Sequence, residues 1–84
     1  MKTILVTGGL GYIGSHTVVE LLKNNFHVII VDDLSNSEKF ILDNIEKVAG
    51  KRPVFFPFDL RRKELLYQVF EAYEIDGCIN FAAF

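Results

Sequence analysis

TGGLGYIG, at residues 7–14, is the stretch that decides the fold of this 84-residue chain. It follows an apolar run, ILV at residues 4–6, and leads into a segment with the apolar spacing of a helix. Its glycines match G-x-G-x-x-G at positions 9, 11 and 14, and together with Thr7 they match T-G-x-x-G-x-x-G. Between a strand and a helix, this spacing is typical of a turn that binds a dinucleotide.

The glycines of this turn have separate physical roles. A pyrophosphate needs nearby backbone N–H groups, and the start of a helix supplies those donors together with a partial positive charge. Gly8 or Gly9 can take the positive φ of a tight turn at little cost. Gly11 leaves room for a phosphate, and Gly14 lets the helix lie close to the strand. The alternative is an ordinary glycine-rich turn without a ligand.

Apolar runs of strand length alternate with amphipathic segments of helix length, which is typical of a parallel sheet covered on both faces. Right-handed crossovers then give the strand order 3-2-1-4 of half a Rossmann-type α/β fold. The chain is therefore expected to be one unit, residues 1–84, the N-terminal part of a Rossmann domain. We expect strands at residues 2–7, 28–31, 53–58 and 78–81 and helices at 12–23, from the segment 35–38 to 49, and 61–73.

Local chemistry refines these elements. Ser35 and Glu38 have the spacing of a capping box, and Gly50 suits the end of the same helix. Pro53 and Pro57 place the third strand at the sheet edge because proline donates nothing to the ladder. The residues expected on the buried helix faces are Gly14, Val18, Leu21 and Leu22; Ile41, Ile45, Val48 and Ala49; and Leu65, Leu66, Val69, Phe70 and Tyr73.

The second strand ends at Asp32, eighteen residues after Gly14. This is close to the roughly twenty residues that separate the glycine turn from the carboxylate that binds the adenosine ribose. The same carboxylate repels a 2′-phosphate. Since Asp33 follows it and residues 33–37 contain no Arg or Lys, the sequence predicts NAD rather than NADP. An exposed loop aspartate is the alternative interpretation of Asp32.

Asp59 ends the third strand on the same edge of the sheet. Its carboxylate can accept a hydrogen bond from the adenine amino group while Leu60 packs against the ring. Aspartate is also a preferred N-cap, so Asp59 can equally begin the third helix. The sequence leaves both interpretations open.

Composition excludes several other classes of function. Nine Lys and Arg against eleven Asp and Glu give a net charge of −2, without the basic stripe that nucleic-acid binding requires. No segment has the length of a signal peptide core or a membrane span, so we expect a cytoplasmic protein. The single cysteine, Cys78, is expected in a buried strand and not as a nucleophile. His16 and His27 have no metal-ligand spacing, so no metal site is expected.

Four stretches together resemble a known family. They are residues 7–16, 32–37, 58–61 and 80–83, and they look like the N-terminal part of the extended short-chain dehydrogenase/reductases. The resemblance covers all 84 residues and is greatest to the UDP-glucose 4-epimerases. The glycine motif is shared with sugar-nucleotide dehydratases and reductases, whereas GYIGSH combined with DDLSNS is more particular to the epimerases.

The resemblance implies a set of NAD-binding residues. Asp33 departs from the family, which often has asparagine there, and a carboxylate donates no hydrogen bond. The implied contacts are the backbone near Gly8, Gly11, Tyr12 and Ile13 for the pyrophosphate; Asp32, Asp33, Asn36 and Ser37 for the ribose; Asp59 and Leu60 for the adenine; and Phe81, Ala82 and Ala83 along the cofactor channel.

The family's epimerases oxidise the sugar C4 hydroxyl with NAD, rotate the keto intermediate and return the hydride, using the tyrosine of a Tyr-x-x-x-Lys motif. No such motif occurs here, because Tyr12, Tyr67 and Tyr73 are followed four positions later by His16, Glu71 and Gly77. The resemblance therefore implies an inactive fragment of an isomerase of galactose metabolism that acts on a nucleotide sugar. The alternatives are a fragment of a nucleotide-sugar 4,6-dehydratase and a non-catalytic nucleotide-binding module.

Residues 78–81 are expected to form an apolar strand at the edge of the sheet. An edge strand with unpaired N–H and C=O groups invites pairing with another chain. We therefore expect the fragment to self-associate through this strand. We also expect weak NAD affinity, because only the adenosine half of the contacts is present.

Overall fold

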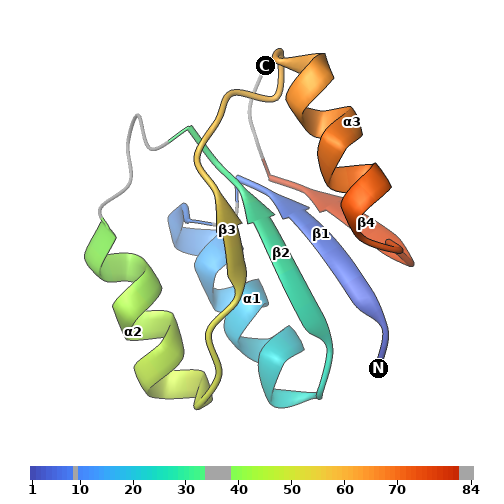
Figure 1. The fold of residues 1–84 in the computed structure, drawn as a ribbon. Coiled ribbons are helices and arrows are strands. Elements are labelled where there is room, and N and C mark those ends of the chain that lie inside the picture. Colours follow the sequence, from blue (N-terminus) through green and yellow to red (C-terminus); the bar gives the residue numbers. More distant parts are fainter. Residues whose placement is uncertain (9, 34–38, 82–84) are drawn as a thin grey trace.

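The computed structural model describes residues 1–8, 10–33 and 39–81. Within them, strands and helices alternate along the chain as the sequence predicts (Figure 1). The elements are β1 (Thr3–Thr7), α1 (Tyr12–Lys23), β2 (His27–Val31), α2 (Lys39–Ala49), β3 (Val54–Phe56), α3 (Lys63–Ala72) and β4 (Gly77–Asn80).

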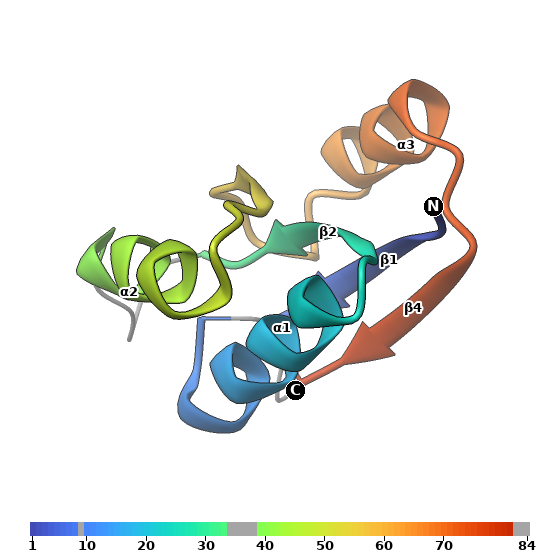
Figure 2. The same cartoon turned by 90° about the horizontal axis from the view of Figure 1, so that it is seen from below.

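The strands form one parallel sheet in the order β3-β2-β1-β4, which confirms the predicted topology. Helices α1 and α2 cover one face of this sheet and α3 lies on the other (Figure 2). This is the layering that right-handed crossovers impose when the chain moves first toward β3 and then back to β4.

The core lies on both faces of the two central strands. Val28, Ile29 and Ile30 have no exposed surface, as expected for an uninterrupted apolar run in a parallel strand. Alternate side chains of this run point to opposite faces. Val28 and Ile30 pack with buried residues of α1 and α2, whereas Ile29 packs with Val69 of α3.

The edge strands differ in detail from the prediction. β3 contains three residues instead of the predicted six, and Pro53 and Pro57 flank it. β4 begins one residue earlier than expected, and Cys78 is exposed, so its predicted burial is wrong. The register pairs Cys78 with Leu5, but Val69 of α3 packs on β1 and β2 and leaves this part of β4 uncovered. Partial burial nevertheless raises the pKa of the Cys78 thiol.

The helix faces agree with the prediction for α1 and only partly for the other two. Gly14, Val18 and Leu22 are buried in α1. In α2 the buried positions are Leu42 and Ile45, and Val48 is 60% exposed. In α3, Phe70 is 47% exposed.

The helix ends also follow local chemistry. Asn25 and Gly50 take positive φ values of 67° and 77° just after α1 and α2. The predicted capping box, Ser35 with Glu38, lies outside the described residues. Among the described residues no helix has the length and apolar character needed to span a bilayer.

Candidate functional site

The carboxyl ends of the four strands meet at one edge of the sheet, at the top of Figure 1. The chain leaves β1 toward β2 and reaches β4 from the other direction, so the topological switch lies between β1 and β4. Ligands of open α/β sheets bind in the crevice at such a point. The glycine turn, Asp32, Asp59 and Phe81 follow β1, β2, β3 and β4 respectively.

The glycine turn begins with a left-handed residue. Gly8 has a φ of 72°, which confirms one of the two positions predicted for positive φ. Its N–H donates to the Val31 carbonyl at 2.9 Å, and the N–H of Gly11 donates to the Gly8 carbonyl at 3.3 Å. The chain therefore turns immediately after the carboxyl end of β1. Gly9 lies outside the described residues.

Helix α1 starts at this turn with an open N-terminus. Gly11 occupies the N-cap position, no side-chain hydrogen bond caps the helix, and its first turn contains no acidic residue. The side chains of Tyr12 and Ile13 are 81% and 66% exposed. The first amides of a helix have no carbonyl partner within it and carry its positive dipole end. This arrangement suits an anion.

The Asp32 carboxylate turns toward the glycine turn. Its Oδ2 accepts a hydrogen bond from the Leu10 N–H at 3.2 Å, although 22 positions separate the two residues. Asp32 is half-buried and Asp33 is exposed. The Asp32 N–H also donates to the Phe56 carbonyl at 3.3 Å, which joins the ends of β2 and β3. Asp32 is thus held beside the start of α1.

Leu10 is a residue of the site to which the sequence analysis gave no role. Its side chain is 1% exposed and packs in the core beneath α1 and α2, while its N–H holds Asp32. The signal was available, because Leu10 is the one large apolar residue within the glycine stretch at positions 7–11. An anchor of this kind fixes a turn that glycines alone leave free.

Thr7 and Asn80 form a second contact that the sequence analysis did not identify. The Thr7 hydroxyl donates to Asn80 Oδ1 at 2.6 Å, and Thr7 is 4% exposed. The pair joins the carboxyl ends of β1 and β4, where the strands are in register. The predicted strands end at Thr7 and Phe81, so pairing them end to end would place Phe81 opposite Thr7, whereas the observed register pairs Thr7 with Asn80.

Asp59 does not cap α3. The helix begins at Lys63 with Arg62 at the N-cap position, so the N-cap interpretation is wrong. Asp59 instead accepts a hydrogen bond from the Arg61 N–H at 2.8 Å and pairs with the Arg61 guanidinium at 2.6 Å. The side-chain and backbone hydrogen bonds from Arg61 lower the pKa of Asp59 to about 2. Leu60 is half-buried and packs against the core on the α3 side.

The remaining predicted residues are placed only in part. Phe81 is half-buried, packs on the core beneath α1, and donates its N–H to the Thr7 carbonyl at 2.8 Å. Asn36, Ser37, Ala82 and Ala83 lie outside the described residues. The described residues contain no group of three or more His, Cys, Asp or Glu side chains that could hold a metal ion.

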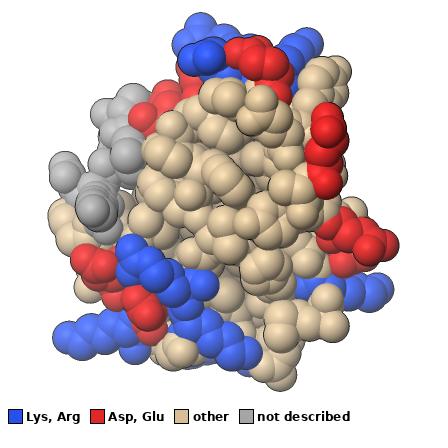
Figure 3. All heavy atoms as spheres, viewed as in Figure 1, with Lys and Arg blue, Asp and Glu red and all other residues tan. Residues whose placement is uncertain are grey.

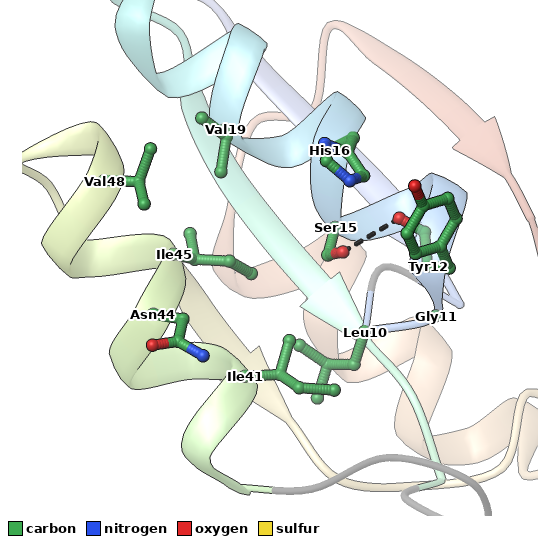
Figure 4. Close-up of a pocket in the computed structure, with 10 residues that line it drawn as sticks. All are labelled: Leu10, Gly11, Tyr12, Ser15, His16, Val19, Ile41, Asn44, Ile45 and Val48. Carbon is green, nitrogen blue, oxygen red and sulfur yellow. Dashed lines mark hydrogen bonds between the residues drawn. The ribbon is translucent and has the colours of Figure 1, made fainter.

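A groove of about 420 Å³ lies between α1 and α2 (Figure 4). Leu10, Ile41, Ile45 and Val48 line it, together with polar residues such as His16, whose ring meets Tyr12 edge-on at 4.9 Å. Neither Asp32 nor Asp59 is among the lining residues. Gly11 and Tyr12 also line the groove, so it adjoins the glycine turn and the start of α1 while leaving out these two carboxylates.

Charges of both signs gather around the carboxyl edge of the sheet. At the top of Figure 3, basic and acidic side chains lie against each other above a broad uncharged face. The segment from the end of β3 to the first turn of α3 contributes the ion pairs Asp59 with Arg61 and Arg62 with Glu64. The edge thus presents mixed charge on this face of the molecule.

Comparison with known proteins gives the relatives of the chain. The family model described as GDP-mannose 4,6 dehydratase matches residues 5–84. The bifunctional protein GAL10 of Pachysolen tannophilus is 49% identical over 83 residues, which are 99% of this chain and 12% of that protein. The UDP-glucose 4-epimerase of Neisseria meningitidis serogroup A is 48% identical over 82 residues, 98% of this chain and 24% of that enzyme.

A solved structure has the same fold. The crystal structure of UDP-glucose-4-epimerase from Stenotrophomonas maltophila, with bound NAD and formylated UDP-arabinopyranose, superimposes with a TM-score of 0.95 at 39% identity. The match covers 100% of this chain and 25% of that one. The chain thus spans a quarter or less of the length of these relatives.

Proposed function

Since the chain belongs to the family described as GDP-mannose 4,6 dehydratase, and is 48% identical to a UDP-glucose 4-epimerase, we propose that it is the NAD-binding part of such an epimerase. One observation carries the proposal: the Asp32 carboxylate is held at the glycine turn, 3.2 Å from the Leu10 N–H, beside the start of α1. A pyrophosphate at the start of α1 and a ribose on Asp32 would then lie next to each other. The relatives support it, since the Stenotrophomonas enzyme was crystallised with NAD and a UDP sugar.

The residues of the glycine turn fit a pyrophosphate. Gly8 needs its glycine for a φ of 72°. Gly11 does not, because the nearest described atom to an added Cβ is the Gly8 carbonyl oxygen at 3.6 Å, an ordinary contact. A ligand that approaches the backbone closely gives a reason for glycine at position 11 that the packing of the chain does not.

The roles of the binding residues follow from their chemistry. Amides of Tyr12, Ile13 and Gly14 at the start of α1 would hold the pyrophosphate, and Asp32 would accept from the adenosine ribose. The same carboxylate would repel a 2′-phosphate, so the site would prefer NAD to NADP. Asp33, Asn36 and Ser37 would complete the ribose contacts, and Phe81, Ala82 and Ala83 would line the channel.

The bound dinucleotide would supply the hydride acceptor and donor of the epimerase reaction. The 84 residues contain no Tyr-x-x-x-Lys motif, so this chain would bind and orient the cofactor without moving the substrate proton. The nucleotide sugar, UDP-glucose or UDP-galactose, would be a substrate of the whole enzyme.

We also propose a cytoplasmic location and self-association of the fragment through β4.

Calorimetric titration of the chain with NAD and with NADP tests the proposal. We expect weak binding of NAD, because only the adenosine half of the contacts is present, and still weaker binding of NADP. Equal affinities, or no binding of either, would refute it.

The alternatives need different measurements. A dehydratase is the second candidate because the family model carries that description. Product analysis of a full-length enzyme that contains this sequence, supplied with UDP-galactose, separates the two activities, since an epimerase forms UDP-glucose. A gene with no Tyr-x-x-x-Lys downstream of codon 84 would favour the non-catalytic module.

A further inference from the structure

Helix α3 carries two aromatic side chains on a side that points away from the core. Tyr67 is 64% exposed and Phe70 is 47% exposed. They are three positions apart on the helix and are therefore neighbours on its surface, whereas Val69 packs into the core. A single exposed apolar residue is ordinary, but two adjacent aromatic rings form a patch that a partner can cover.

The charges at the two ends of α3 do not stabilise the helix by themselves. Lys63 is its first residue, Glu71 lies in its last turn, and Glu74 follows two residues after its end. A cation at the start and anions at the end each lie at the unfavourable pole of the helix dipole. All three residues are exposed, and within the described part of the chain no ion pair includes them. Glu64, the acidic residue of the first turn, is paired with Arg62.

These aromatic and charged residues have a symmetrical spacing. Intervals of four, three and four positions separate Lys63, Tyr67, Phe70 and Glu74. In a two-fold pair of identical chains, a contact of residue i with residue j is always matched by a contact of j with i. An antiparallel pair of α3 helices, with the two-fold axis between Tyr67 and Phe70, brings each tyrosine to the phenylalanine of the other copy. The same axis brings each Lys63 to the acidic end of the other helix.

We propose that this side of α3, the α3 face, docks against the same face of a second copy of the chain. The α3 face is formed by Lys63, Tyr67, Phe70, Glu71 and Glu74. Charge complementarity selects the antiparallel arrangement, because a parallel pair would place like charges together at both ends. The antiparallel arrangement also places Lys63 at the negative pole of the other helix, where a cation is favoured.

The position of α3 in the fold is compatible with this contact. In the view shared by Figures 1 and 3, an uncharged surface separates the charged side chains at the top, where α3 begins, from acidic side chains on the right, where it ends. Helix α3 lies on the opposite side of the sheet from α1 (Figure 2). The inference therefore goes beyond the proposed NAD-binding function and does not depend on it. A contact made by one helix of 10 residues is small, so we expect a weak dimer.

Charge reversal in the whole 84-residue chain tests the inference. One variant is Lys63→Glu, and a triple variant adds Glu71→Lys and Glu74→Lys, which exchanges the charges of the two ends. Lys47→Glu is the matched control, because it makes the same change of charge at an exposed residue of α2. Sedimentation equilibrium measures the dissociation constant of the dimer, and urea unfolding followed by circular dichroism checks the fold of each variant.

We expect Lys63→Glu to raise the dissociation constant by roughly tenfold or more, because the two-fold axis makes each lost attraction and each new repulsion occur twice. The triple variant should return to within about threefold of the unsubstituted chain, since opposite charges meet again. Lys47→Glu should change the constant by less than about twofold. Lys63→Glu puts an acid at the start of α3, which favours the helix, so unfolding does not explain a lost dimer.

The aromatic contact is tested separately. Tyr67→Ala should raise the dissociation constant by roughly tenfold, because it removes two symmetry-related aromatic contacts. Phe40→Ala is the matched control, since Phe40 is 59% exposed on α2. It should change the constant by less than about twofold, the effect of a residue outside the interface.

The inference is supported if Lys63→Glu weakens the dimer and the triple variant restores it. It is overturned if the chain is a monomer at every concentration, or if the triple variant dimerises as weakly as Lys63→Glu. It is also overturned if Lys63→Glu and Tyr67→Ala leave the association unchanged, because the copies would then meet through another surface such as β4. Calorimetry with NAD, which tests the proposed function, is independent of all these outcomes.

Discussion

Asp32→Asn is the substitution that most directly probes the proposed site. Asparagine has nearly the same shape and keeps an oxygen that can accept the Leu10 N–H, which lies 3.2 Å from Oδ2. The glycine turn should therefore keep its anchor. The charge is removed, so the effect on ligands is separated from the effect on the fold.

The expected change in affinity follows from the hydrogen bonds involved. A charge-assisted bond contributes about 1.5–3 kcal/mol and a neutral one about 0.5–1.5 kcal/mol. Loss of the charge should thus weaken NAD binding by about 1–1.5 kcal/mol, roughly tenfold. For NADP the sign reverses, because two unit charges about 5 Å apart repel by about 3 kcal/mol at a surface dielectric near 20. NADP should therefore bind better to the variant.

The assay is calorimetric titration of both cofactors at one fixed salt concentration, since screening changes the repulsion. Asp43→Asn is the control, because it removes the same charge from a 70% exposed side chain on α2. A ratio of NAD to NADP affinity that Asp32→Asn leaves unchanged would refute the reasoning. An equal shift in Asp43→Asn would also refute it, by assigning the effect to net charge.

Four further predictions concern other parts of the structure. Gly8→Ala should lower the free energy of unfolding by about 1 kcal/mol because of the φ of 72°, whereas Gly11→Ala should leave urea unfolding nearly unchanged and weaken NAD binding. Thr7→Val should lower the free energy of unfolding by about 0.5–1.5 kcal/mol in the same assay, because it removes the buried hydroxyl that donates to Asn80. The pKa of Asp59 is depressed from 3.8 to about 2, so its pairing with Arg61 should be complete above pH 3.8 and be lost as the pH falls through about 2; a carboxyl chemical shift titrating near 3.8 would contradict this. Sedimentation equilibrium should show self-association of the chain that increases with concentration, and a monomer throughout would remove the role given to β4.

The arrangement of the sheet could be predicted because it depends on local signals. The uninterrupted run at residues 28–31 specifies a central strand, and the handedness of crossovers then leaves one strand order. Burial at the periphery depends on how far a helix extends over its neighbours. Val48 and Phe70 satisfy the helical spacing but lie at the margins of α2 and α3, and Cys78 lies beyond the part of the sheet that Val69 covers. Spacing alone does not contain that information.

In the candidate site, too, features that depend on local sequence could be predicted and features that depend on tertiary contacts could not. The positive φ of Gly8 follows from the glycine pattern, since few other residues tolerate it. The contact between Leu10 and Asp32 spans 22 positions and exists only once β1 and β2 are paired. Asp59 shows the limit of propensity, because aspartate is favoured both as an N-cap and at the start of a turn that closes on the N–H two residues later. In the structure Asp59 starts such a turn, and the Arg61 guanidinium pairs with its carboxylate. Helix α3 therefore begins later, at Lys63.

The carboxyl edge combines a rigid part with an adjustable one, and this division bears on specificity. Thr7, Leu10 and Asp32 are held by buried or half-buried contacts, so under the proposed function they would define where a phosphate and a ribose lie. Asp59 and Arg61 form a pair two residues apart on an exposed loop, and substitution there disturbs little of the core. Contacts to a base at Asp59 could therefore change without loss of the fold, whereas loss of the Asp32 oxygen that accepts the Leu10 N–H would alter both the turn and the cofactor that the site would accept. Replacement of Asp32 by alanine, which unlike asparagine keeps no acceptor, should consequently affect both folding and binding, and replacement of Asp59 by alanine should affect binding alone.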